Sequence, residues 1–341
     1  MQNTEISNEL SAVRSVRSKA PVFVVGSPRS GTTLLYHMLL SAGNFTIYRA
    51  ESQVFNLLEP RFGDLSVASN RERLLRAWCA SSLFAKTGLD VAEVSEKVMA
   101  SCRNGGDFLR LVMEAMAQQQ KVERWADSTP EHVLYLDRIQ ATVPDALAIH
   151  IIRDGRDVAL SLQKQAWIRP FPWDHAKDLE VAALYWEWVV QEGRKCSAEL
   201  GERYTEIRYE DLVLNPRAVL TELSRFVDQD LDYDRIERVG VGSVSHPNSS
   251  FAGELEGGVF TPVARWKNSL DARQISVLDE LVGETLRQLE YPVQTIGTPM
   301  GTRKSLARMR SIYRAYFGLK YRLKKGTPLG RIFMSGDFSW V

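Results

Sequence analysis

The stretch that decides the fold is residues 21–35, PVFVVGSPRSGTTLL. Its apolar part, Val22–Val25, is typical of a buried strand, and the amphipathic run Thr33–Ala42 is typical of a helix. Gly26 and Gly31 mark a tight loop between the two. Backbone N–H groups at the start of a helix have no partner inside the helix, and together with the helix dipole they attract anions. The stretch therefore predicts a strand, loop and helix that hold a phosphate-like group.

The same loop argues against ordinary ATP chemistry. Gly26 and the run Gly31, Thr32 and Thr33 have the spacing of a P-loop, but Thr32 stands where a lysine would reach the β- and γ-phosphates. An ATPase or kinase without that lysine would be badly disabled. The positive charge lies inside the loop, at Arg29. We therefore expect the loop to hold a shorter anion chain, with one arginine and two hydroxyls.

A second apolar run, residues 146–152 with the sequence ALAIHII, predicts another buried strand. Arg153 follows this run directly, and Ser161 lies eight residues further on, in the helix expected there. In open α/β sheets, ligands lie outside the carboxyl ends of the strands, so both loops should face one crevice. Arg153 and Ser161 could hold a second phosphate in that crevice, apart from the first.

The two motifs, in this order, resemble those of the sulfotransferases that use 3′-phosphoadenosine 5′-phosphosulfate (PAPS). The resemblance covers about residues 21–291 and looks closest to bacterial members related to the tyrosylprotein branch, because STPEH at 128–132 and RYEDLV at 208–213 recur in that group. It implies a three-layer α/β, P-loop-like fold with a central parallel sheet flanked by helices. It also implies PAPS as co-substrate and 3′-phosphoadenosine 5′-phosphate (PAP) as product. The sequence has no HExxH motif and no clustered His/Asp site, so we expect no catalytic metal.

The resemblance also assigns residues to the donor. By this resemblance, the first loop binds the 5′-phosphosulfate through Arg29, Ser30, Gly31, Thr32 and Thr33. Arg153 and Ser161 would bind the 3′-phosphate, and the ring of Tyr209 would lie near the adenine. Arg265 and Trp266 belong to a glycine-rich loop region that closes over the nucleotide in the family, where they would contact a phosphate and form a wall.

In-line sulfuryl transfer needs a group that stabilises charge on the leaving phosphate and a base that removes the acceptor proton. Arg29, inside the loop, is the candidate for the first task. Glu51 is the candidate base, because in the tyrosylprotein branch a glutamate follows the first helix and a short second strand. A partly dry site could raise its pKa. His132 and His246 are alternatives, since the aryl and steroid branch uses a histidine.

Two positions depart from the family pattern. Ser128 stands where relatives often carry a lysine that assists at the leaving oxygen. Arg29 alone, Lys164 or Lys267 would then supply the charge, or Ser128 would hydrogen-bond in its place. Ala264 replaces a serine of the closing loop. Two alternatives stay open: a divergent P-loop kinase, which the missing lysine and the absence of magnesium-binding acids disfavour, and an inactive homologue that binds nucleotide.

Composition narrows the class of protein. The chain has 341 residues, 44% of them hydrophobic, and a net charge of +1, which argues against a nucleic-acid binder driven by overall charge. No apolar run approaches the ~20 residues of a membrane-spanning helix, and the polar first residues lack a signal-peptide pattern. Three isolated cysteines, Cys79, Cys102 and Cys196, suit a reducing cytoplasm and have no metal-ligand spacing. We expect a cytoplasmic enzyme without a metal.

The chain divides into a polar segment, 1–20, a sulfotransferase-like domain, 21–296, and a C-terminal extension, 297–341. Alternating apolar runs and helical patterns predict a parallel sheet in the domain. Strands are expected at Val22–Val25, Thr46–Tyr48, Ala148–Ile152 and Tyr204–Tyr209. Residues 54–121 are mostly helical in pattern and would build part of the acceptor side. Thr129 and Pro130 predict a helix start with a capping hydroxyl.

The C-terminal extension is strongly basic, with Asp337 as its sole acid from Gly301 onward. Apolar side chains recur there at helical spacing between basic ones, at Leu306, Met309, Tyr313, Tyr316 and Phe317. This pattern predicts a basic amphipathic helix. Such a helix could dock peripherally on an anionic membrane, or pack on the chain's own acidic domain or a second subunit, which we favour. The acceptor hydroxyl could belong to a small molecule, a glycan or a lipid.

Overall fold

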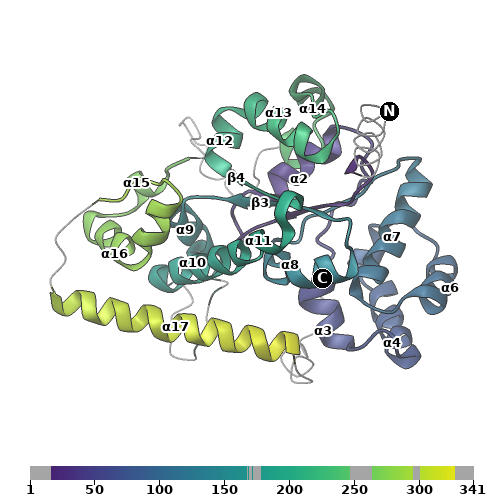
Figure 1. Ribbon diagram of the computed structural model, residues 1–341, viewed down its shortest axis with the longest axis horizontal. Coiled ribbons are helices and arrows are strands. Elements are labelled where there is room, and N and C mark those ends of the chain that lie inside the picture. The colour runs from purple at the N-terminus through teal and green to yellow at the C-terminus, as the bar shows by residue number, and fades with distance from the viewer. Residues whose placement is uncertain are drawn as a thin grey trace, which may run out of the picture.

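The computed structural model describes residues 17–166, 168, 171, 178–245, 263–294 and 300–326. Within these residues four parallel strands form one sheet in the order β2-β1-β3-β4, with helices on both faces (Figure 1). The strands are β1 Val22–Val25, β2 Ala126–Asp127, β3 Leu147–Ile152 and β4 Tyr204–Arg208. The chain therefore has the three-layer α/β, P-loop-like fold that the sequence predicts.

The sheet divides the core into two layers, because successive side chains of a strand point to opposite faces. In β1, Val22 and Val24 pack with the apolar cluster on one face, and Phe23 and Val25 pack with the cluster on the other. The first face is covered by α2 Thr32–Ser41, α12 Tyr209–Leu214, α13 Pro216–Val227 and α14 Tyr233–Val239. The second face is covered by α9 Gly155–Gln165 and α10 Leu179–Lys195. Both faces are buried, as is usual for a parallel sheet.

Three of the four predicted strands are confirmed at β1, β3 and β4, with ends shifted by at most one residue. The strand predicted at Thr46–Tyr48 is wrong. Only Phe45 forms an isolated bridge, with Arg124, and the N–H of Ile47 donates to the side chain of Gln120. The strand that pairs with this edge of β1 is β2, which is too short to leave a pattern in the sequence.

The helical region predicted between residues 54 and 121 is confirmed and lies at one end of the sheet (Figure 1). It consists of the π-helix η1 Val54–Leu58 and the α-helices α3 Glu59–Phe62, α4 Ala68–Cys79, α5 Ser82–Ala85, α6 Val91–Ser101 and α7 Gly105–Gln120. Trp78 packs edge-on against Phe108, with ring centroids 5.0 Å apart. This region extends the second core layer beyond the sheet.

The connections that follow are short helices: the 3₁₀ helices η2 Pro130–Tyr135, η3 Gly201–Arg203 and η4 Gly242–Val244, and the α-helices α8 Leu136–Thr142, α11 Ser197–Leu200 and α15 Trp266–Ser269. α16 Ala272–Gln288 then packs on α10. None of the helices in the described ranges is long and apolar enough to cross a membrane.

The predicted C-terminal helix is present as α17 Met300–Gly326, a long helix that runs along α10 and α16 (Figure 1). Its side chains Tyr313 and Phe317 are buried against the protein. Arg310 donates two hydrogen bonds to the buried carboxylate of Glu187, at 2.7 and 2.8 Å, and Arg303 pairs with Glu280 at 3.1 Å. The apolar face of the helix therefore packs on the chain's own domain, which is the interpretation that the sequence favoured.

Candidate active site

The loop between β1 and α2 lies against its neighbours so closely that two positions require glycine. A Cβ on Gly26 would lie 2.5 Å from the carbonyl oxygen of Ile151, and one on Gly31 would lie 2.3 Å from Cδ2 of Tyr209. Gly31 also has a φ of 98°, in the left-handed region that glycine adopts easily. It is the N-cap of α2 and provides no side-chain cap. The N–H groups of the first turn are therefore left for another acceptor.

Ser30 supplies the observation that most directly indicates an anion in this loop. Its side chain is fully buried, and its Oγ has no hydrogen-bond partner among the described residues. Buried hydroxyls in folded proteins nearly always have a partner, so an orphan needs an explanation. Thr32 is also buried and Thr33 is exposed beside it at the helix start. The loop therefore fits an oxyanion that would accept hydrogen bonds from it.

The two sequence motifs meet directly. Arg29 Nε donates a hydrogen bond to Ser161 Oγ at 2.9 Å, and Arg153 Nη1 donates to the carbonyl oxygen of Arg29 at 3.4 Å. Burial and the charge of Arg153 lower the pKa of Arg29. The sequence predicted two separate phosphate contacts, whereas here the loop arginine and the serine of the second motif touch. Neighbouring guanidinium groups repel each other, and a bound anion relieves that repulsion.

Tyr209 and Arg265 lie beside this pair of arginines. The guanidinium carbon of Arg153 is 4.5 Å from the centroid of the Tyr209 ring. Burial raises the pKa of Tyr209, and the charges of Arg153 and Arg265 oppose that rise. The ring is 7% exposed and packs on Gly31, so most of it is already covered by protein. Arg153 and Arg265 thus lie near one tyrosine at the carboxyl end of the sheet.

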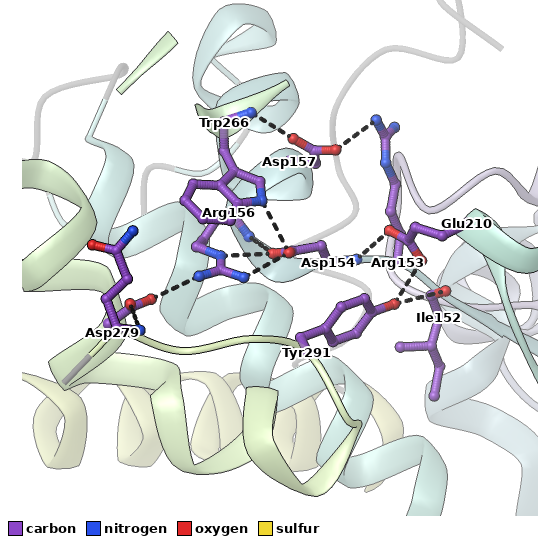
Figure 2. A network of polar contacts seen from close by, with 10 residues as sticks. Ile152, Arg153, Asp154, Arg156, Asp157, Glu210, Trp266, Asp279 and Tyr291 are labelled. Carbon is purple, nitrogen blue, oxygen red and sulfur yellow. Dashed lines mark hydrogen bonds and ion pairs between the residues drawn. The ribbon is translucent and has the colours of Figure 1, made fainter. Parts of the chain in front are cut away.

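Trp266 belongs to a buried polar network (Figure 2). The guanidinium of Arg156 stacks on its ring, 3.7 Å from the centroid, and its Nε1 donates to Asp154 Oδ2 at 3.1 Å. Its backbone N–H donates to Asp157 Oδ1 at 2.9 Å, and Arg156 Nη1 reaches Asp279 Oδ1 at 3.0 Å. The ring predicted to form a nucleotide wall is thus 3% exposed and anchors α15 to α9.

This network, which sequence reasoning missed, also positions Arg153. Asp157 Oδ2 accepts from Arg153 Nη2 at 3.3 Å, while the N–H of Asp154 donates to Glu210 Oε1 at 3.0 Å (Figure 2). Tyr291 OH donates to the other oxygen of Glu210 at 2.8 Å. The alternating charges of RDGRD, residues 153–157, were the available signal, but their partners lie too far along the chain to be inferred.

Glu51 lies near the loop arginine, and the charge of each shifts the pKa of the other. Its carboxylate accepts a hydrogen bond from the side chain of Gln53. The side chain reaches solvent, but the surrounding protein desolvates it, and the charges of Asp127 and Glu131 add to this effect. Its pKa is raised to about 7, against the opposing charge of Arg29. A carboxylate with this pKa can accept a proton near neutral pH.

His132 has a structural role. It is fully buried, its Nδ1 lies 2.8 Å from Asp127 Oδ2, and its Nε2 accepts from the N–H of Phe55 at 3.3 Å. Because a backbone N–H can only donate, the ring proton must lie on Nδ1, which donates to Asp127. Both ring nitrogens are therefore occupied, which removes His132 as an alternative base. His246, the other histidine considered, lies outside the described residues.

Thr129 does not cap the helix that follows it, contrary to the prediction. Its Oγ1 accepts from the N–H of Gln53 at 3.2 Å and donates to Asp127 Oδ1 at 3.4 Å. The segment from Pro130 onward is a 3₁₀ helix without a side-chain cap. Thr129 thus ties the Glu51 segment to β2, because the hydroxyl has partners on both.

The groups proposed to replace the missing lysine come from three different segments. Ser128 is buried next to β2, and Lys164 lies in the last turn of α9. Lys267 Nζ lies 5.7 Å from the centroid of the Trp266 ring. In the described ranges, no group of three His, Cys, Asp or Glu side chains could hold a metal ion. The glycine-rich residues 257–262, the N-terminal residues 1–16 and the C-terminal residues 327–341 lie outside those ranges.

Comparison with known proteins identifies the family. Residues 21–233, more than half of the chain, match a family model described as "Sulfotransferase family", so the chain belongs to that family. No curated protein matches the chain significantly.

Solved structures similar to the chain include three sulfotransferases. The sulfotransferase domain of the Synechococcus PCC 7002 olefin synthase is 17% identical, with 85% of this chain and 94% of that one covered and a TM-score of 0.48. The sulfotransferase domain from the curacin biosynthetic pathway is 16% identical, with 86% and 97% covered and a TM-score of 0.46. Sulfotransferase STF9 from Mycobacterium avium is 15% identical, with 80% and 77% covered and a TM-score of 0.44. These likenesses are too distant to carry a functional argument.

Proposed function

We propose that this member of the sulfotransferase family transfers a sulfuryl group from PAPS to a hydroxyl acceptor. The observation that carries the proposal is the meeting of Arg29, Arg153 and Ser161 beside a loop with a buried, orphaned Ser30 hydroxyl. A donor with phosphate groups at the 5′ and 3′ positions of its ribose could contact both motifs at once. Membership of the family supports the reaction.

The chain offers distinct groups for the two ends of the donor. Ser30, Thr32, Thr33 and the N–H groups of the first turn of α2 would hold the 5′ end. Arg153 and Ser161 would hold the 3′-phosphate, with Asp157 and the network behind it fixing the orientation of Arg153. Tyr209 and Arg265 would border the nucleotide, and buried Trp266 would support this side from beneath rather than stack on the base.

PAPS, when bound, supplies an activated sulfuryl group on a good leaving group. Arg29 would stabilise the negative charge that develops on the leaving 5′-phosphate. Glu51 would take the proton of the acceptor hydroxyl, whose oxygen forms the new bond to sulfur as the bond from sulfur to the 5′-phosphate breaks. The pKa of Glu51, about 7, suits this task because a useful fraction of the carboxylate is ionised at neutral pH.

The test is binding of PAP to the whole chain by calorimetry, with AMP and ATP–Mg²⁺ as competitors. We expect metal-independent binding of PAP that neither competitor matches. Preference for ATP–Mg²⁺ would overturn the proposal in favour of a divergent kinase. PAP binding without any turnover of PAPS over a broad panel of hydroxyl compounds would instead favour an inactive homologue.

The peripheral membrane contact predicted from the sequence would need the outer face of α17. Ile312 and Leu319 are 46% and 59% exposed there, and Arg308 and Arg322 are exposed on the same helix. We propose that any contact with anionic lipid uses this face, since the inner face is packed. Cosedimentation with anionic but not neutral vesicles, lost on Leu319→Asp, would support it. Equal sedimentation of the variant would contradict it.

A further inference from the structure

A pocket of about 210 Å³ lies between η2, α10 and α17. Its walls are mainly aromatic and include Tyr135, Tyr185, Trp188, Tyr316, Phe317 and Tyr321. None of the residues assigned above to the donor lines it. The pocket is therefore a second feature of the molecule, separate from the anion site.

The C-terminal helix supplies one side of this pocket and holds the other side in place. Phe317 of α17 meets Tyr185 of α10 edge-on, with centroids 5.4 Å apart, and lies 5.6 Å from Trp188. Tyr321 meets Tyr135 of η2 edge-on at 5.5 Å. Edge-to-face pairs of this kind fix the orientation of both rings. The aromatic walls are thus preformed, and the pocket exists only because α17 packs on the domain.

The lining of the pocket also includes the charged residues Glu131, Lys320 and Lys324. The two oxygens of Glu131 accept hydrogen bonds from Tyr185 OH at 3.1 Å and Asn56 Nδ2 at 3.2 Å. Burial would raise the pKa of Glu131, but the charge of Lys324 and these hydrogen bonds bring it below its usual value. Lys324 also lines the pocket, and no hydrogen bond joins it to another residue of the described chain. Its ammonium has three protons to donate to a ligand.

Hydrogen bonds connect Glu131 of the pocket to the candidate base. Asn56 Nδ2 also donates to Gln53 Oε1, and Gln53 Nε2 donates to Glu51. A chain of hydrogen bonds thus runs from Glu131 in the pocket to Glu51 beside Arg29. The charge of Glu131 reaches Glu51, whose pKa it helps to raise. A molecule that occupies the pocket with a polar group beside Glu131 would be linked to the base through Asn56 and Gln53.

We propose that this pocket binds the acceptor, and that the acceptor carries its hydroxyl on a flat apolar body of one or two fused rings. This inference rests on the proposed function, because it names the acceptor class of the same site. An apolar cavity of about 150 Å³ accommodates benzene, so the 210 Å³ found here suits a somewhat larger ring system. Aromatic walls favour a ring over a flexible chain, since ring pairs add to area burial. Glu131 and Lys324 would direct the hydroxyl toward Glu51.

The experiment uses 2-naphthol as the probe and calorimetry on the whole chain, with and without PAP. Tyr316→Ala removes one ring of the wall, and Lys324→Met removes the ammonium but keeps the length of the side chain. Leu319→Ala is the matched control, because Leu319 lies on the same helix but is 59% exposed and outside the pocket. We expect 2-naphthol to bind about tenfold more weakly to Tyr316→Ala, on the scale of one lost ring pair, and unchanged to Leu319→Ala.

The outcomes separate this inference from the proposed function. Weaker 2-naphthol binding to Tyr316→Ala and Lys324→Met, with PAP affinity retained, would support the pocket as the acceptor site. Wild-type protein that binds PAP but not 2-naphthol, or variants that all bind it equally, would overturn the pocket and leave the donor site intact. Pocket-dependent binding of 2-naphthol by a chain that fails to bind PAP would overturn the proposed function instead.

Discussion

The anion side of the site and the proposed acceptor pocket are built in different ways. Arg29 and Arg153 follow β1 and β3, which are neighbouring parallel strands, so the sheet itself brings the two loops together. The pocket instead combines residues of three helices, Glu131, Trp188 and Lys324. No strand pairing joins these helices, and they meet through side-chain packing. The first side is therefore fixed by backbone topology and the second by the docking of α17. Substitutions on one side should leave binding on the other side unchanged.

The largest expected effect is that of Glu51→Gln, which removes the candidate base but keeps its shape. Turnover should fall by about 10²–10⁴-fold, the usual contribution of general base catalysis, while PAP affinity stays the same. Steady-state rates with PAPS and calorimetry with PAP measure the two quantities. Glu93→Gln, on the exposed face of α6, is the matched control. A rate that survives in Glu51→Gln would mean that the base lies elsewhere.

Arg29→Ala should come next. Loss of a group that stabilises leaving-group charge costs about 10²–10³-fold in turnover. PAP should also bind more weakly, because the guanidinium and its contact with Ser161 are gone. Binding of 2-naphthol should not change. Arg217→Ala, at an exposed ion pair with Asp234, is the control for loss of an arginine. Near-normal turnover of Arg29→Ala would remove its assigned role.

The pH dependence of kcat/KM should show a smaller effect. The raised pKa of Glu51, about 7, means that the carboxyl is protonated and inactive below that pH and ionised above it. Activity should therefore rise through pH 7 and be about tenfold lower one pH unit below the pKa than on the plateau. The inflection should vanish from the residual activity of Glu51→Gln. An inflection near the ordinary glutamate pKa would contradict the desolvated position of this carboxylate.

The smallest effect concerns the docking of α17. Arg310→Ala removes both hydrogen bonds to Glu187, whose carboxylate would remain buried without them, so unfolding free energy should fall by about 1–3 kcal/mol. Urea denaturation measures this loss. Arg314→Ala, which is exposed on the same helix, should change stability by no more than about 0.5 kcal/mol. Equal effects of the two substitutions would argue that the Arg310 contact does not hold the helix.

The sequence predicted the anion side well because its signals are local. β1, the glycine loop, α2 and the run from β3 to Arg153 are contiguous segments whose patterns need no knowledge of partners. It did not predict that Arg29 contacts Ser161, because that contact depends on where the loop side chain points. The strand predicted at Thr46–Tyr48 was wrong for a similar reason. The N–H of Ile47 donates to a side chain on α7, a contact that the local pattern does not reveal.

The sequence did not predict the proposed acceptor pocket, whose lining lies outside the region 54–121 that was expected to build part of the acceptor side. Basic amphipathic spacing indicated that α17 would form, but nothing in that spacing names Glu187 or Glu131 as its partners. The prediction that Thr129 caps a helix was wrong, because its hydroxyl instead makes hydrogen bonds with Gln53 and Asp127. Contacts between side chains far apart in the chain decide this region, and such contacts leave no local pattern.

We propose that the second motif recognises a 3′-phosphate, and the most direct test compares the binding of PAP and AMP to wild type and to Ser161→Ala. We predict that wild type binds PAP more tightly than AMP and that Ser161→Ala reduces this preference by about tenfold, the scale of one hydrogen bond to a charged group. Thr33→Ala, on the 5′ side, should weaken both nucleotides equally. Equal affinity of wild type for PAP and AMP, or an equal loss for both in Ser161→Ala, would contradict recognition of a 3′-phosphate by the second motif.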